Sequence, residues 1–144
     1  MFRVEVQVKR LVEAAKIPVR ATEGAAFCDV YAVKDTLLKR NLVTSIPTGL
    51  GFAIPTGYEM EIRPRSGLSQ HKILLANSPG TLDSDYRGEL KILLLNLGNR
   101  DYLVKIGDRI AQIGIRPNPE INFREVSELP KTTRGSGGFG STGR

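Results

Sequence analysis

The chain has 144 residues, a length that suits one domain with a hydrophobic core of its own. Its 21 Lys and Arg exceed its 15 Asp and Glu, and the formal charge of +6 favours anionic partners, either nucleic acid or small phosphorylated ligands. The single cysteine, Cys28, excludes an internal disulfide framework, and without a signal-like or membrane-length apolar run we expect a soluble cytoplasmic protein.

Alternation of apolar and polar residues is the main pattern, and it begins at the N-terminus. Residues 2–8 alternate strictly and predict a half-buried strand, as do residues 58–63. The segment 92–95 is apolar throughout and suits a strand that is buried on both faces. Further strands are expected near 27–33, 41–46, 50–54, 72–76, 102–106, 109–116 and 121–126.

Turn residues separate these segments at short intervals. The turn signals lie at 47–49, 55–57, 78–80, 98–99 and 106–108. Short strands with such punctuation indicate an all-β sandwich or barrel. The helical pattern is weak: residues 10–16 suit a turn or two, and Ser66 is expected to cap a short helical turn over 67–71.

The composition changes near Lys131, where glycine, serine and threonine begin to dominate. Such a segment buries little apolar area, so we expect a β-domain over 1–130 and a mobile arm over 131–144. The ordinary alternative is a frayed terminus or linker. Arg134 at the head of the glycines and Phe139 among them favour a ligand-binding arm, because arginine binds phosphate and an aromatic ring stacks on a flat ligand.

A polar decapeptide, residues 80–89, lies between hydrophobic stretches. It places the carboxylates of Asp83 and Asp85 beside Tyr86 and Arg87. Carboxylates near a basic residue can bind a metal, orient a water or accept a proton. The alternative is a polar hairpin whose acidic residues cap turns.

Two further clusters offer binding groups. Arg65 and Ser66 follow a strand at a turn, where backbone donors, a hydroxyl and a guanidinium would suit an anion; the alternative is an ordinary turn with an exposed arginine. The segment 107–112 ends in Gln112, either a ligand to water or phosphate or a buried glutamine bonded to the backbone.

Taken in order, these segments resemble the five motifs of the trimeric dUTP pyrophosphatases (dUTPases). The matching segments are 25–32, 64–68, 77–89, 107–112 and 134–143. One such motif is a modest signal, whereas five in the same order and spacing are specific. The resemblance covers nearly the whole chain and implies a jelly-roll-like β-fold, in agreement with the all-β prediction.

The resemblance implies a homotrimer with shared active sites that hydrolyses dUTP to dUMP and pyrophosphate, with Mg²⁺ on the triphosphate. The reaction would remove dUTP and supply dUMP for dTMP synthesis. Asp83 would orient and deprotonate the water that attacks the α-phosphorus, and Tyr86 would lie against the deoxyribose and exclude a 2′-hydroxyl. Asn77, with main-chain groups near Thr81 and Leu82, would hydrogen-bond the edge of uracil.

The remaining implied contacts surround the phosphates, the metal and the base. Arg65, Ser66, Gly67 and Gln112 would hold phosphate or water, Lys91 would line the uracil pocket, and Asp29 would reach Mg²⁺ through water. The arm would come from a neighbouring subunit, with Phe139 stacked on uracil and with Arg134, Gly138, Ser141 and Thr142 around the γ-phosphate. Its closure would exclude water from the reaction.

The chain departs from the family pattern at Phe27, where glycine is usual, and at Cys28, where tyrosine is frequent. His71, the only histidine, is expected to be a surface or structural residue. A regular strand would also point Asp83 and Tyr86 to opposite faces, so the segment has to bend if both contact one nucleotide.

Three alternatives stay open. A dCTP deaminase shares the fold and a related Arg-Ser motif but lacks this Asp-Ser-Asp-Tyr arrangement. A basic β-barrel that binds nucleic acid would need stacking platforms, whereas this chain has no Trp, five Phe and four Tyr. A dUTPase-like regulatory protein would bind the nucleotide and signal to a partner. We expect neither nucleic acid nor a membrane as a partner.

Overall fold

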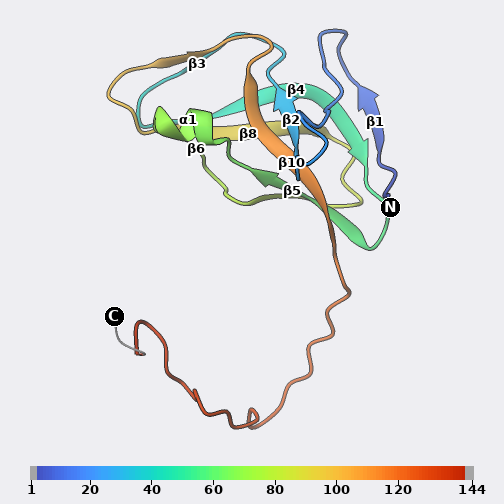
Figure 1. The fold of residues 1–144 in the computed structure, drawn as a ribbon, viewed down its shortest axis with the longest axis vertical. Coiled ribbons are helices and arrows are strands. Elements are labelled where there is room, and N and C mark those ends of the chain that lie inside the picture. Colours follow the sequence, from blue (N-terminus) through green and yellow to red (C-terminus); the bar gives the residue numbers. More distant parts are fainter. Residues whose placement is uncertain (1–2, 142–144) are drawn as a thin grey trace.

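The computed structural model describes residues 3–141, and short β-strands form most of its regular structure (Figure 1). In chain order the elements are β1 (Gln7–Arg10), β2 (Cys28–Tyr31), β3 (Thr36–Leu38), β4 (Val43–Ala53), β5 (Tyr58–Arg63), α1 (Ser66–Gln70), β6 (Ile73–Leu75), β7 (Gly80–Leu82), β8 (Glu89–Asn96), β9 (Tyr102–Val104) and β10 (Arg109–Pro117). This confirms the all-β prediction. Within the described range, no helix is long and apolar enough to cross a membrane.

The strands form two four-stranded antiparallel sheets and a two-stranded ribbon. The first sheet has the order β1-β4-β8-β6, the second has the order β2-β10-β5-β7, and β3 pairs with β9. The alternation seen in the sequence places the apolar residues between the sheets: Leu90, Ile92 and Leu94 of β8 are buried, as are Met60 and Ile62 of β5. One core cluster joins the two sheets.

The predicted turn at 47–49 is wrong, because β4 runs through it as one strand of 11 residues. The register between β4 and β8 shifts inside this segment, so β4 contains a bulge. Gly49 has a φ of +67°, and its N–H donates to the Oε1 of Glu89 at 2.9 Å. The buried hydroxyl of Thr48 donates to the carbonyl of Leu90 at 2.6 Å. The turn residues therefore bend a continuous strand instead of ending it.

Two other predicted elements do not form. Residues 10–16 make turns and no helix, because Arg10 still pairs with β4 and Leu11 donates its N–H to the carbonyl of Gly49. The segment 121–126 is not a strand in the described structure, since alternation without a neighbouring strand gives no hydrogen-bonded ladder.

At the N-terminus the strand begins at Gln7 and not at Phe2, which lies outside the described residues. Ser66 is the first residue of α1 and does not cap it; Arg65 stands at the cap position with extended backbone and no side-chain capping bond. The strands β3 and β7 were not predicted from the sequence.

Beyond Pro117 the chain leaves the sheets and runs away from them as an extended arm, residues 118–141 (Figure 1, orange to red). The N–H of Asn118 donates to the carbonyl of Gly57 at 2.8 Å, which fixes the base of the arm to the loop between β4 and β5. Large apolar side chains of the arm, Phe123 and Leu129, are 88% and 81% exposed. The segment 118–141 therefore has no core of its own, and the mobility expected for residues 131–144 stays a prediction.

Candidate functional site

A carboxylate and two guanidinium groups meet on the sheet that contains β2 and β10. Asp29 of β2 pairs across the strands with Gln112 of β10. The Nε of Arg65 lies 2.9 Å from Oδ1 of Asp29, and Nη1 of Arg109 lies 3.6 Å from Oδ2. The amide of Gln112 donates to the carbonyl of Pro64 at 2.9 Å. Three predicted site residues thus lie together, and Arg109 joins them as a residue that the sequence reasoning did not assign.

The turn after β5 presents backbone and hydroxyl donors next to this ion pair. Ser66 and Gly67 begin α1 and are exposed, and a Cβ built on Gly67 would meet open space. Their N–H groups belong to the first turn, where no preceding carbonyl inside the helix accepts them. Free N–H groups, a hydroxyl and the guanidinium of Arg65 together suit phosphate oxygens.

The hairpin around β7 forms a second group of predicted residues. β7 pairs with β5 in the register Ile62↔Gly80, and Leu82 is buried, whereas Asn77 and Thr81 are exposed. A Cβ on Gly80 would lie 3.3 Å from the amide nitrogen of Asn77 and 3.2 Å from Ile62. Glycine at this position thus lets the Asn77 side chain lie close to the strand that carries Thr81.

The chain turns sharply directly after β7. The N–H of Tyr86 donates to the carbonyl of Asp83 at 3.2 Å, and both side chains are exposed. The phenol of Tyr86 donates to the carbonyl of Glu89 at 3.2 Å. The Nη1 of Arg87 donates to the carbonyls of Ser84 and Tyr86, at 2.7 and 3.0 Å. The predicted bend between Asp83 and Tyr86 is confirmed, because the two residues share one turn and not a regular strand.

The predicted residues form separate groups within one chain. β2, with Asp29, and β7, with the hairpin, are the opposite edge strands of one sheet. Lys91 is exposed on β8 of the other sheet. The arm residues lie away from both sheets (Figure 1). One copy of the chain in this conformation therefore does not bring all the predicted residues together.

The arm bonds mainly to itself. The Nε of Arg134 donates to the carbonyl of Gly137 at 2.8 Å, and the N–H of Ser141 donates to the carbonyl of Gly138 at 3.0 Å. Phe139 is fully exposed, with a φ of 51°. Thr142 lies outside the described residues.

The side chain of Phe27, the residue that departs from the family pattern, packs over Gly114 of β10. A Cβ on Gly114 of β10 would lie 2.8 Å from the Phe27 ring, and the guanidinium of Arg63 lies 4.4 Å from the ring centre. The Nε of Arg63 pairs with Glu61 at 2.6 Å, and Arg116 pairs with the other oxygen of Glu61. Hydrogen bonds from Arg63 and then Arg116 hold the pKa of Glu61 below its ordinary value. A bulky side chain is thus accommodated without removing Asp29 from its strand.

Neither Cys28 nor His71 is placed for catalysis. Burial raises the pKa of the Cys28 thiol above its ordinary value, although Arg20 opposes the effect, so the thiol is protonated at neutral pH. His71 is exposed, and its ring centre lies 5.9 Å from that of Tyr102. This position confirms that His71 is a surface residue.

Among the described residues no three His, Cys, Asp or Glu side chains gather as a metal site. Asp29 supplies a single carboxylate, and both of its oxygens face guanidinium groups. Mg²⁺ on a polyphosphate takes its inner ligands from phosphate and water and needs few protein oxygens. Asp29 therefore fits an outer contact through water.

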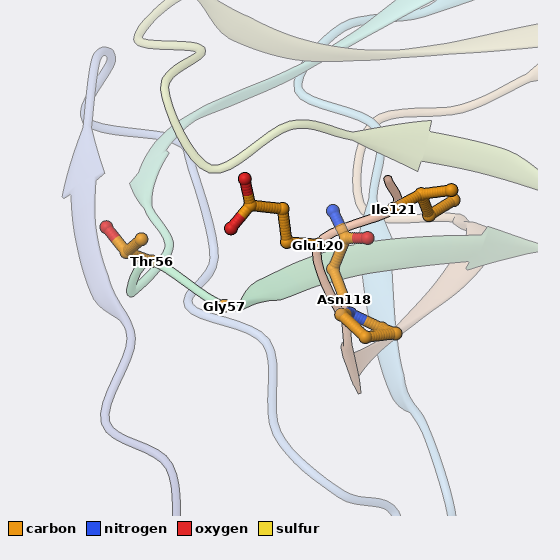
Figure 2. A pocket seen from close by; sticks show the side chains of 6 residues that line it. Thr56, Gly57, Asn118, Glu120 and Ile121 are labelled. Carbon is orange, nitrogen blue, oxygen red and sulfur yellow. The ribbon is translucent and has the colours of Figure 1, made fainter. Parts of the chain in front are cut away.

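A recess of about 550 Å³ lies at the base of the arm (Figure 2). Asn118 and Glu120 border it from the arm, and Thr56 and Gly57 border it from the loop between β4 and β5. None of the predicted site residues lines it. The recess therefore belongs to the junction of arm and body and not to the candidate site.

Comparisons with known proteins agree with this architecture. A family model described as dUTPase matches residues 13–143. A deoxyuridine 5'-triphosphate nucleotidohydrolase of Rickettsia typhi is 47% identical and covers 99% of both chains; that of Nautilia profundicola is 46% identical and covers 98% of this chain and 100% of its own. A solved structure of a mutant dUTPase from Staphylococcus bacteriophage 80alpha, with dUpNHpp, has a TM-score of 0.90 at 25% identity and covers 97% of this chain and 99% of that one.

Proposed function

Because the chain belongs to the dUTPase family, and is therefore an enzyme that hydrolyses dUTP to dUMP and pyrophosphate, we propose that Asp83 is its catalytic base. The observation that best supports this role is the turn after β7, in which the N–H of Tyr86 donates to the carbonyl of Asp83 and both side chains are exposed. Asp83 accepts a proton from the water that attacks the α-phosphorus, while the oxygen that leaves stays with pyrophosphate. Tyr86 packs on the deoxyribose at the same turn.

The uracil and the phosphates have separate sites in this proposal. Asn77 and the main chain at Thr81 and Leu82 hydrogen-bond the edge of uracil, and Lys91 lines the same pocket. Arg65, Ser66 and Gly67 bind phosphate oxygens, and Gln112 orients phosphate or the water. Support for the phosphate site comes from the two guanidinium groups and the exposed donors at the start of α1.

Mg²⁺ fits this site as a metal that Asp29 contacts through water. When bound, the ion neutralises charge on the triphosphate. Asp29 also orients Arg65, to which it is bonded at 2.9 Å. A cytoplasmic location suits the unpaired thiol of Cys28.

The functional unit is proposed to be a homotrimer whose active sites are shared between subunits. The separation of Asp29 from the β7 hairpin within one sheet supports this assembly. So does the arm, whose exposed apolar residues such as Phe123 gain burial only against another surface. An arm from a neighbouring copy would close over the nucleotide, with Phe139 on uracil. Arg134, Gly138, Ser141 and Thr142 would surround the γ-phosphate.

A pyrophosphate-release assay on dUTP, dCTP, dTTP and UTP, with and without Mg²⁺, tests the activity. Release from dUTP alone, and its loss on metal removal, are the expected results. Ammonia release from dCTP would instead assign the chain to the deaminase alternative. Salt-dependent nucleic-acid binding without dUTP turnover would favour the β-barrel alternative.

Substitution of Asp83 tests the mechanism. Asp83→Asn keeps the shape of the side chain and removes the base, so kcat should fall by about 10²–10⁴ while the affinity for dUpNHpp changes little. Asp85→Asn, two residues along the same exposed loop, is the matched control and should retain normal turnover. A near-normal kcat for Asp83→Asn would refute the role of Asp83.

A further inference from the structure

The ring of Tyr86 lies directly over Gly88. A Cβ built on Gly88 would be 3.0 Å from Cε2 of that ring and closer still to Cζ and Oη. Separations below 3.0 Å are essentially never seen for real Cβ atoms. The observed ring position is therefore available only while residue 88 has no side chain.

The backbone next to Gly88 is held by strand pairing. A Cβ built on Gly51 would lie 3.7 Å from the carbonyl oxygen of Gly88, an ordinary contact distance, so the two backbones are neighbours. The next residue, Glu89, pairs with Gly51 across the strands. Its side-chain Oε1 accepts the N–H of Gly49 at 2.9 Å. Its carbonyl accepts the Tyr86 phenol. Tyr86 is 44% exposed, so the ring is the part that would move, at small cost to folding.

We propose that Gly88 is a specificity-determining residue, because it seats the Tyr86 ring and thereby fixes the wall that excludes a 2′-hydroxyl. This inference rests on the proposed contact between Tyr86 and deoxyribose. Ordinary contact begins near 3.5 Å, so an alanine at 88 would displace the ring by about 1 Å or more. Misplacement of this size alters rates by up to about 100-fold. A ribonucleotide would gain the space that the ring vacates.

The test compares kcat/KM for dUTP and for UTP in the wild type, in Gly88→Ala and in Gly24→Ala. Gly24→Ala is the matched control, because a Cβ there has nothing within 4 Å. Gly88→Ala should lower the preference for dUTP over UTP by about 10-fold or more, with a melting temperature close to that of the wild type. Gly24→Ala should leave both quantities unchanged. An unchanged preference in Gly88→Ala would overturn the inference.

The same measurements in a Tyr86→Ala variant distinguish the role proposed for Gly88 from the role of Tyr86 itself. Tyr86→Ala should lower the preference strongly, and adding Gly88→Ala to it should change nothing further, because no ring remains to displace. If Tyr86→Ala keeps the preference, the proposed sugar contact fails and the inference fails with it. If Tyr86→Ala loses the preference but Gly88→Ala keeps it, only the inference about Gly88 fails.

An equal effect of Gly88→Ala with and without the Tyr86 ring also overturns the inference about Gly88. If Gly88→Ala alone melts early, the double variant should melt normally, since the clash is gone.

Discussion

Replacement of Thr48 by valine should destabilise the fold much more than its small chemical change suggests. Thr48 is 1% exposed within the bulge of β4. Its hydroxyl donates to the carbonyl of Leu90 at 2.6 Å and accepts the N–H of Leu50 at 3.3 Å. Valine has nearly the same volume but neither function, so both backbone groups lose this partner where water does not reach.

The magnitude follows from those two contacts. A buried polar group left without its partner costs about 1–3 kcal/mol. Assigning about 2 kcal/mol to the short bond to Leu90 and about 1 kcal/mol to the longer bond from Leu50, we expect a total loss of about 3 kcal/mol. For a chain of this size, each kcal/mol lowers the melting temperature by roughly 2–4 °C, which gives a shift of roughly 6–12 °C.

Urea and thermal unfolding at one fixed protein concentration would measure this loss, since association changes apparent stability. Thr44→Val is the matched control: Thr44 lies in the same strand, in the regular ladder opposite Leu94, and is only half-buried. It should cost less than about 0.5 kcal/mol. A loss below about 1 kcal/mol for Thr48→Val would refute the reasoning, because the bulge would then not depend on the hydroxyl.

Three further predictions concern other parts of the chain. Because burial raises the pKa of Cys28, iodoacetamide should alkylate it more slowly at pH 7 than it alkylates free cysteine; an equal or faster rate would contradict the burial effect. Since two guanidinium groups lower the folded-state pKa of Glu61, its stabilising effect should be complete above the ordinary pKa of an unfolded glutamate and vanish as pH falls through the lower folded-state pKa. The difference in urea midpoint between the wild type and Glu61→Gln should shrink on acidification, and widening would disprove the assignment. Deletion of 131–144 should remove most dUTP turnover without changing the melting temperature, because the bonds of the arm are mainly local; loss of the cooperative melt would show that the arm is structural.

The fold class was predictable because alternation depends on which residues need burial. Residues 58–63 and 92–95 alternate or stay apolar, and both lie in strands at the centre of the two sheets. The errors occurred where tertiary partners decide the outcome. Residues 121–126 alternate equally well but have no strand beside them in the described structure. At 47–49, turn residues were overridden by pairing with β8 on both sides.

The candidate site was predictable as a set of residue types but not as a geometry. Motif order identified Asp29, Arg65 and Gln112, and these residues do lie together. Order alone did not show that Arg109 pairs with the second oxygen of Asp29, because its partner lies far away in the sequence. Motif order also did not show that the Tyr86 ring packs over Gly88, because this contact depends on the path of the loop after β7.

Glycines near the site act mainly through the space above them and not through unusual backbone angles. Gly80, Gly88 and Gly114 each lack a φ in the left-handed range, and a Cβ on them would crowd Asn77, Tyr86 and Phe27 in turn. Gly49 differs, since its φ of +67° is one that other residues rarely adopt. Alanine at Gly49 should therefore mainly lower the free energy of unfolding. At Gly88 the displaced group is an exposed ring at the proposed sugar site, so alanine there should act first on substrate choice. The same amino acid thus has two separable roles within one bent strand and its partner hairpin.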